Sequence, residues 1–130
     1  SGNLDQVTKI IEMTQDEDFE IISGDDGLTL PIMAIGGAGV ISVVANVAPK
    51  LTVSMVEAFR KGNMEEARRL HLKLAPLIRA VFLETNPIPI KKAVGLIGLP
   101  AGDLRLPLAS MSDDNERKLI TALKDLNLLK

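Results

Sequence analysis

The sequence contains no cysteine, tyrosine or tryptophan among its 130 residues, and His71 is its single histidine. The lack of cysteine excludes disulfides, thiol catalysis and zinc–thiolate sites. One histidine argues against a histidine-based metal site or a Ser-His-Asp triad, so we expect no metal. We interpret His71 as a surface or boundary residue. Without tyrosine, this chain supplies no tyrosyl proton relay.

The charge and hydropathy of the sequence exclude further classes of protein. The net charge is −2, which provides no basic surface for nucleic acid. The apolar fraction is 46%, yet no run approaches the ~20 apolar residues of a transmembrane helix. The first residues, SGNLDQ, are neither basic nor apolar, unlike a signal peptide. We therefore expect a cytoplasmic protein without membrane contact. A start at Ser-Gly-Asn without an initiator Met is compatible with a tag remnant, a processed end or a chain that begins partway through a larger protein.

Residues 23–46 organise the chain. Apolar runs predict strands over 19–22 and 40–44, separated by a helix over 28–35 that stops at Gly36-Gly37. Both strands are apolar on both faces, which is typical of a parallel sheet covered by helices.

The loop Gly24-Asp25-Asp26 follows the carboxyl end of the first predicted strand, where α/β folds bind ligands. Two interpretations of the loop are open. It contacts a ligand, or one aspartate caps the next helix while the other is solvated. The run from Gly36 to Gly39 resembles a phosphate loop only weakly, because it precedes a strand.

Three asparagines occupy positions typical of helix caps. Asn3 precedes a helix that should end near Thr14, Asn46 precedes a helix over 47–61, and Asn63 precedes a long helix. Pro76 lies inside the long helix and should kink it.

Proline and acidic residues set the expectations for the last third of the chain. Two prolines in 86–90 predict an extended or turn geometry that holds the amide of Asn86, as a plain turn or as part of a site. A short helix should follow over 91–97, with Lys91 and Lys92 on a solvated face. Residues 99–108 suit an extended connection, and Ser112 or Asp113 should cap the last helix.

Two strands do not complete a sheet. A parallel pair leaves unpaired N–H and C=O groups at both edges, and a two-stranded sheet is marginal in isolation. We therefore predict an α/β fold in which this chain is the carboxyl-terminal part of a larger sheet or barrel.

Taken together and in order, the motifs resemble the carboxyl-terminal portion of the 4-hydroxy-tetrahydrodipicolinate synthase (dihydrodipicolinate synthase) family. The matching segments are Ser1-Gly2-Asn3-Leu4, Ser23-Gly24-Asp25-Asp26, Gly36-Gly37-Ala38-Gly39-Val40-Ile41-Ser42, Ala45-Asn46, Asn86-Pro87-Ile88-Pro89-Ile90-Lys91 and Leu104-Arg105-Leu106-Pro107. The resemblance implies a (β/α)8 TIM barrel, with 19–23 as strand seven and 40–44 as strand eight. It divides the chain into a barrel part, 1–62, and an added helical region, 63–130.

The resemblance also implies an activity. Members of the family are lyases that join pyruvate to a lysine as a Schiff base and condense it with aspartate semialdehyde, in diaminopimelate and lysine biosynthesis. They use no cofactor and form homo-oligomers, as tetramers or dimers. The family's lysine would fall just upstream of Ser1, so we expect no catalytic residue in this chain and no activity without the amino-terminal part of the barrel.

Four binding residues follow from the resemblance. Ile41 matches a residue that lies against bound pyruvate. Gly24 and Asp25 match the loop near the entry of the aldehyde substrate, and Asn86 matches a residue at the edge of that site.

Two alternatives remain at this point. One is another pyruvate-dependent aldolase, such as N-acetylneuraminate lyase or a keto-deoxy sugar-acid aldolase. The other is a non-catalytic module whose sheet edge pairs with a second copy or with a partner.

Overall fold

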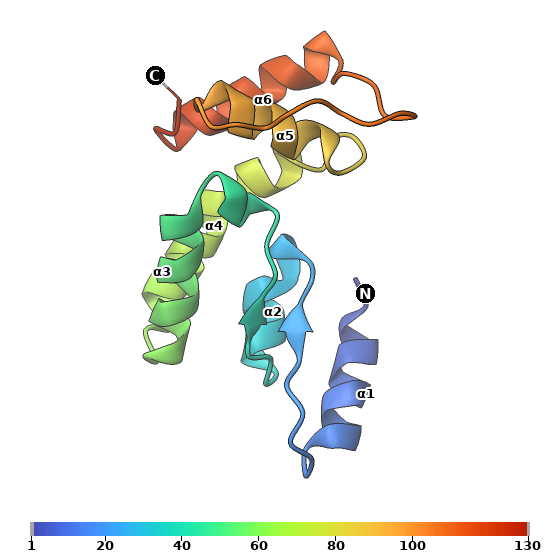
Figure 1. Ribbon diagram of the computed structural model, residues 1–130. Helices are drawn as coiled ribbons and strands as arrows, with labels where there is room; N and C mark the ends of the chain where they lie inside the picture. The colour runs from blue at the N-terminus through green and yellow to red at the C-terminus, as the bar shows by residue number, and fades with distance from the viewer. Residues whose placement is uncertain (1, 130) are drawn as a thin grey trace.

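The structure is a computed structural model and describes residues 2–129. The elements are, in order, α1 (Leu4–Thr14), β1 (Ile22–Ser23), the 3-10 turn η1 (Asp26–Leu28), α2 (Thr29–Ala34), β2 (Gly39–Val40), the 3-10 turn η2 (Val44–Asn46), α3 (Pro49–Arg60), α4 (Met64–Ala80), α5 (Ile88–Leu96) and α6 (Asp113–Asp125). In Figure 1, α3 and α4 lie side by side, and α5 and α6 lie at the other end of the chain from α1. Over these residues, no helix is both long and apolar enough to cross a membrane.

The two strands pair in parallel, with Ile22 opposite Gly39 and Ser23 opposite Val40. The helix α2 makes the crossover between them (Figure 1). The N–H of Ala38 donates to the carbonyl of Ile21 at 2.7 Å and that of Ile41 to the carbonyl of Ser23 at 2.8 Å. The predicted parallel strand–helix–strand unit is confirmed.

The predicted strand lengths were wrong, because each regular strand has only two residues instead of spanning 19–22 or 40–44. Residues 44–46 form a 3-10 turn instead. Within residues 2–129 each strand pairs with one neighbour, and a sheet of two strands has little regular pairing to extend it. Ile22 is 49% and Ile41 74% exposed within this chain, so burial of both strand faces stays a prediction for the larger sheet.

Glycine sets the turn between α2 and β2. Gly36 has φ +114°, a backbone conformation that residues with a Cβ rarely adopt. The N–H of Gly37 donates to the carbonyl of Ile32 at 2.8 Å, and a Cβ on Gly37 would lie 2.5 Å from Ile32 Cγ2. The predicted glycine stop is confirmed.

Two of the three predicted asparagine caps are confirmed. Asn3 Oδ1 accepts from the N–H of Gln6, and Asn63 Oδ1 from the N–H of Glu66, both at 3.1 Å. The prediction for Asn46 was wrong. Asn46 lies in η2, its side-chain amide donates to the carbonyl of Val43, and α3 begins at Pro49, whose fixed φ suits the first turn of a helix.

The start of α5 also differs from the prediction. The helix begins at Ile88, three residues before Lys91, because Pro89 is compatible with a first turn. The extended or turn geometry predicted for 86–90 therefore ends at Pro87. Residues 99–108 contain no helix or strand, as expected. Pro76 lies inside α4, and the kink there stays a prediction.

The larger core packs η2 and α3 against α4, α5 and α6. Its most deeply buried side chains include Met55, Leu74, Leu77, Leu119 and Leu123. This core extends across residue 62, and the division into 1–62 and 63–130 stays a prediction. A smaller cluster of Leu30, Ala58 and Ala67 joins α2 to α3 and α4. The carboxyl ends of the strands are therefore backed by a packed helical layer.

The core predicts a large difference between two leucines of α4. Leu77 has no exposed surface and Leu72 is 63% exposed. Leu77→Ala should destabilise the fold by about 2–5 kcal/mol, since it leaves a cavity, whereas Leu72→Ala should change stability by less than about 0.5 kcal/mol. Urea unfolding of both variants measures the difference, and equal losses would contradict the packing described.

Candidate functional site

A buried aspartate joins the carboxyl ends of the two strands. Asp26 is 4% exposed. One carboxylate oxygen accepts from the hydroxyl of Ser42. The other accepts from the N–H of Val43 at 2.9 Å and the N–H of Val44 at 3.4 Å. The chain that leaves β2 is therefore fastened to the loop that leaves β1.

The neighbouring aspartate caps its own turn. Asp25 Oδ1 accepts from the N–H of Gly27 at 2.8 Å. The hydroxyl of Ser23 donates to the carbonyl of Asp25 at 2.8 Å and accepts from its N–H at 3.1 Å. One capping aspartate is thus confirmed, but the expectation that the other is solvated was wrong. Asp26 is the residue that sequence reasoning missed, and its one signal was Ser42, the polar interruption of a predicted apolar strand.

A cleft of about 430 Å³ opens beside the segment that leaves β2. Its lining residues are Ile41, Ser42, Val43, Asn46, Asn86, Pro87, Ile90, Lys91, Val94, Pro100 and Ala101. Two of the four predicted site residues, Ile41 and Asn86, therefore meet at one cleft from distant parts of the chain. Gly24 and Asp25 are not among its lining residues. An apolar wall with two side-chain amides, a hydroxyl and an amine suits a small molecule that has a short apolar part and polar groups.

The two lysines of α5 do not form the solvated face that the sequence predicted. The Nζ of Lys91 donates to the carbonyl of Asp103, and Lys92 pairs with Glu116 of α6 at 2.8 Å. Both lysines are partly buried. Lys91 thereby ties α5 to the segment that follows Pro100 and Ala101, two other residues that line the cleft.

A larger cavity of about 980 Å³ lies between α5, residues 102–111 and the start of α6. It is lined by neither Ile41 nor Asn86, and by neither Gly24 nor Asp25. Size alone therefore does not select the candidate site.

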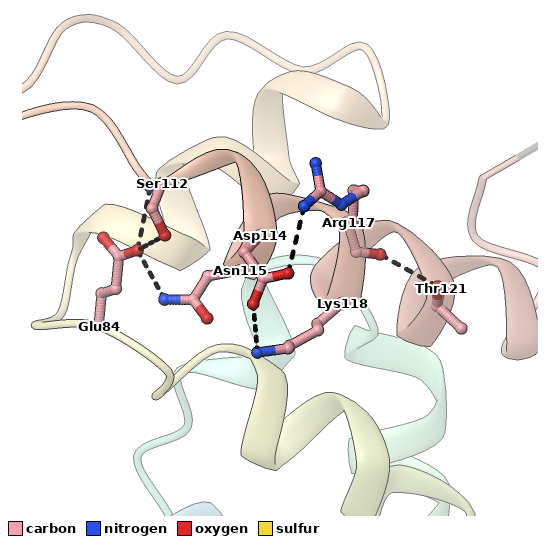
Figure 2. Close-up of polar contacts among 7 residues, drawn as sticks. All are labelled: Glu84, Ser112, Asp114, Asn115, Arg117, Lys118 and Thr121. Atoms are coloured by element: carbon pink, nitrogen blue, oxygen red, sulfur yellow. Dashed lines mark hydrogen bonds and ion pairs between the residues drawn. The ribbon is translucent and has the colours of Figure 1, made fainter.

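The loop that carries Asn86 is clamped to α6 by Glu84 (Figure 2). Glu84 Oε1 accepts from the N–H of Ser112 at 3.0 Å, the hydroxyl of Ser112 at 2.8 Å and the side-chain amide of Asn115 at 2.9 Å. The hydrogen bonds from Asn115 and then from Ser112 lower the pKa of Glu84. Ser112 occupies the N-cap position of α6, one of the two positions predicted, but its side chain makes no cap hydrogen bond, because its hydroxyl donates to Glu84.

Figure 2 also shows a surface ion-pair cluster along α6. Asp114 pairs with Lys118 at 2.7 Å and with Arg117 at 3.2 Å. The pKa of Asp114 is lowered, and the largest cause is the hydrogen bond from Lys118. These side chains are well exposed, so the pairs contribute little to stability.

His71 lies at the boundary between core and solvent, as expected. Its Nδ1 is buried and has no hydrogen-bond partner, and burial lowers the pKa of the imidazole. Among residues 2–129, no three His, Cys, Asp or Glu side chains gather as a metal site would need.

Comparisons with known proteins agree on one family. The model of the dihydrodipicolinate synthetase family matches residues 1–126. The 4-hydroxy-tetrahydrodipicolinate synthase of Methanothrix thermoacetophila is 60% identical over 129 residues, 97% of this chain and 44% of that protein. The synthase of Methanosarcina acetivorans is 58% identical, over 100% of this chain and 45% of that protein. The chain thus spans less than half the length of these relatives.

Solved structures give the same result. The dihydrodipicolinate synthase of Aquifex aeolicus superposes with a TM-score of 0.93 at 43% identity, over 98% of this chain and 43% of that chain. The enzyme of Cyanidioschyzon merolae, solved with lysine bound, has a TM-score of 0.93 at 42% identity, over 99% of this chain and 43% of that chain.

The Glu84 clamp predicts a pH-dependent stability. The pKa of Glu84 lies below its ordinary value of 4.5 in the folded chain. Its carboxylate therefore stabilises the fold above that pH, and the contribution is lost as the pH falls through the lowered pKa. Glu84→Gln should lower Tm at neutral pH, and its difference from wild type should shrink below pH 4.5.

Thermal unfolding from neutral to acidic pH measures this effect. Ser112→Ala provides the control, because it should add little to the pH dependence once Glu84→Gln is present. A Tm difference that is the same at every pH would contradict the clamp.

Proposed function

The chain belongs to the dihydrodipicolinate synthetase family, and from this premise we propose that it forms the carboxyl-terminal portion of a 4-hydroxy-tetrahydrodipicolinate synthase. The synthases of Methanothrix thermoacetophila and Methanosarcina acetivorans, similar along nearly the whole chain, support the assignment. Because the chain spans less than half of their length, the proposed activity belongs to the complete protein.

In the proposed fold, β1 and β2 are strands seven and eight of a (β/α)8 barrel, residues 1–62 complete the barrel, and residues 63–130 form the added helical region. The parallel pairing across α2 supports this arrangement. So do the exposed apolar side chains near the strands, Phe19 at 56% and Ile22 at 49%, which the rest of a barrel would cover.

The proposed reaction proceeds through a lysine that would fall just upstream of Ser1, a residue that itself lies outside the described part of the chain. The amine of that lysine attacks the ketone of pyruvate, and water leaves as the Schiff base forms. Loss of a proton from the pyruvyl methyl group gives an enamine, whose carbon attacks the aldehyde of aspartate semialdehyde. No cofactor takes part.

The residues of this chain bind and orient the substrates in the proposed reaction. Ile41 packs against the pyruvyl group, and Asn86 supplies an amide at the edge of the site. Gly24 and Asp25 lie on the path by which the aldehyde enters. The observation that carries the proposal is that Ile41 and Asn86 line one cleft beyond the carboxyl end of β2.

The proposed setting is that of a biosynthetic enzyme. The complete protein would act in the cytoplasm, in diaminopimelate and lysine biosynthesis, as a homodimer or homotetramer. The other aldolases and the non-catalytic module are less well supported, because the relatives described above are named as synthases at 58–60% identity.

Borohydride trapping tests the proposal on the complete protein, in which this chain follows its amino-terminal part. With pyruvate, intact mass should increase by one reduced pyruvyl group, and peptide mapping should locate it on a lysine upstream of Ser1. Turnover should require aspartate semialdehyde and not N-acetylneuraminate. An adduct within residues 1–130, or no adduct on the active protein, would overturn the assignment.

Asn86 gives a kinetic prediction. Asn86→Ala should raise the KM for aspartate semialdehyde about 10-fold, because it removes an amide that contacts that substrate, and should change the KM for pyruvate less. Asn63→Ala is the control, since Asn63 only caps α4. An unchanged KM for both substrates would remove Asn86 from the site.

A further inference from the structure

The three donors that Asp26 accepts all come from the segment that leaves β2. They are the Ser42 hydroxyl and the N–H groups of Val43 and Val44, which lie 16, 17 and 18 residues further along the chain. The hydroxyl of Ser42 also accepts from the N–H of Ala45 at 2.8 Å. A single buried carboxylate thus fixes the first residues after the strand.

The local sequence explains why a carboxylate from another segment is needed. Val43 occupies the N-cap position of η2, and its apolar side chain makes no cap. The first N–H groups of a helical turn have no partner within the turn. A carboxylate is a pure acceptor with room for several donors and is favoured at the amino end of a turn. Asp26 supplies this cap from the end of β1.

Ile41 lies between two anchors that both belong to residues 23–26. Its own N–H donates to the carbonyl of Ser23 at 2.8 Å, and the residue after it is held by Asp26. The side chain of Ile41 is 74% exposed, so packing within this chain does little to orient it. The direction of Ile41 therefore depends on how the backbone on either side is held.

We propose that Asp26 is a positioning residue for the pyruvate site, because its carboxylate fixes residues 42–44 and thereby sets the side chain of Ile41 against the pyruvyl group. The inference rests on the proposed function. Asp26 touches neither substrate in this account and acts through Ser42, Val43 and Val44. A purely structural role would change stability alone, and a positioning role would also change how pyruvate binds and reacts.

The test compares Asp26→Asn, Asp26→Ala and Ser42→Ala in the complete protein. Asp26→Asn keeps the size of the side chain and loses its charge, and Ser42→Ala removes one donor of the three. We expect the Asp26 variants to raise the KM for pyruvate and slow borohydride-trapped adduct formation about 10-fold or more, with Ser42→Ala intermediate. The KM for aspartate semialdehyde should change less.

Asn63→Ala is the matched control, because it removes the side-chain cap of α4 away from the cleft and should lower Tm without changing either KM. If Asp26→Ala does not fold, Asp26→Asn and Ser42→Ala carry the test. Folded variants with a pyruvate KM and a trapping rate within about 2-fold of wild type would overturn the inference, as would losses that Asn63→Ala reproduces at the same Tm.

The wild-type protein separates this inference from the function on which it rests. A wild type that forms no pyruvyl adduct and has no synthase turnover overturns the proposed function and the role of Asp26 with it. An active wild type with unaffected Asp26 and Ser42 variants overturns the role of Asp26 alone.

Discussion

The structure depends on one constraint, which is that parallel strands need hydrogen-bonding neighbours on both sides. In residues 2–129, β1 and β2 have only each other. The regular pairing is therefore short, and Ile22 and Ile41 stay exposed beside it. The N–H of Ile41 joins the strand ends through the carbonyl of Ser23, and the buried carboxylate of Asp26 adds the bonds from Ser42, Val43 and Val44. The helical layer packs around a core that includes Val44, a residue of the segment held by Asp26.

Features that depend on neighbouring residues could be predicted from the sequence. The caps at Asn3 and Asn63 need only the N–H three residues later, and the stop at Gly36 needs only a positive φ. The parallel strand–helix–strand unit followed from apolar runs separated by a glycine turn. Ile41 and Asn86 were identified by resemblance, and both line the cleft.

Features that depend on distant segments could not be predicted. The partners of Asp26 lie 16–18 residues away, and nothing near Asp26 in the sequence distinguishes it from a solvated aspartate. Lys92 was misinterpreted because its partner, Glu116, comes from another part of the chain. Ser112 was placed at the start of α6, but the bond from its hydroxyl to Glu84 could not be predicted for the same reason. The strand lengths were overestimated because a run of apolar residues indicates a strand that is paired and covered on all sides. In residues 2–129 each strand pairs with only one other strand, so its regular pairing is short.

We propose that this chain forms one wall of a pyruvate site in a larger enzyme, with Ile41 as the contact. A crystal structure of the complete protein, reduced with borohydride in the presence of pyruvate, tests it most directly. The account predicts the pyruvyl group on a lysine upstream of Ser1, with its carbons within about 4 Å of the side chain of Ile41. It also predicts that the cleft between Ile41 and Asn86 opens onto that group. A pyruvyl group outside van der Waals contact with Ile41, or at another end of the strands, would contradict it.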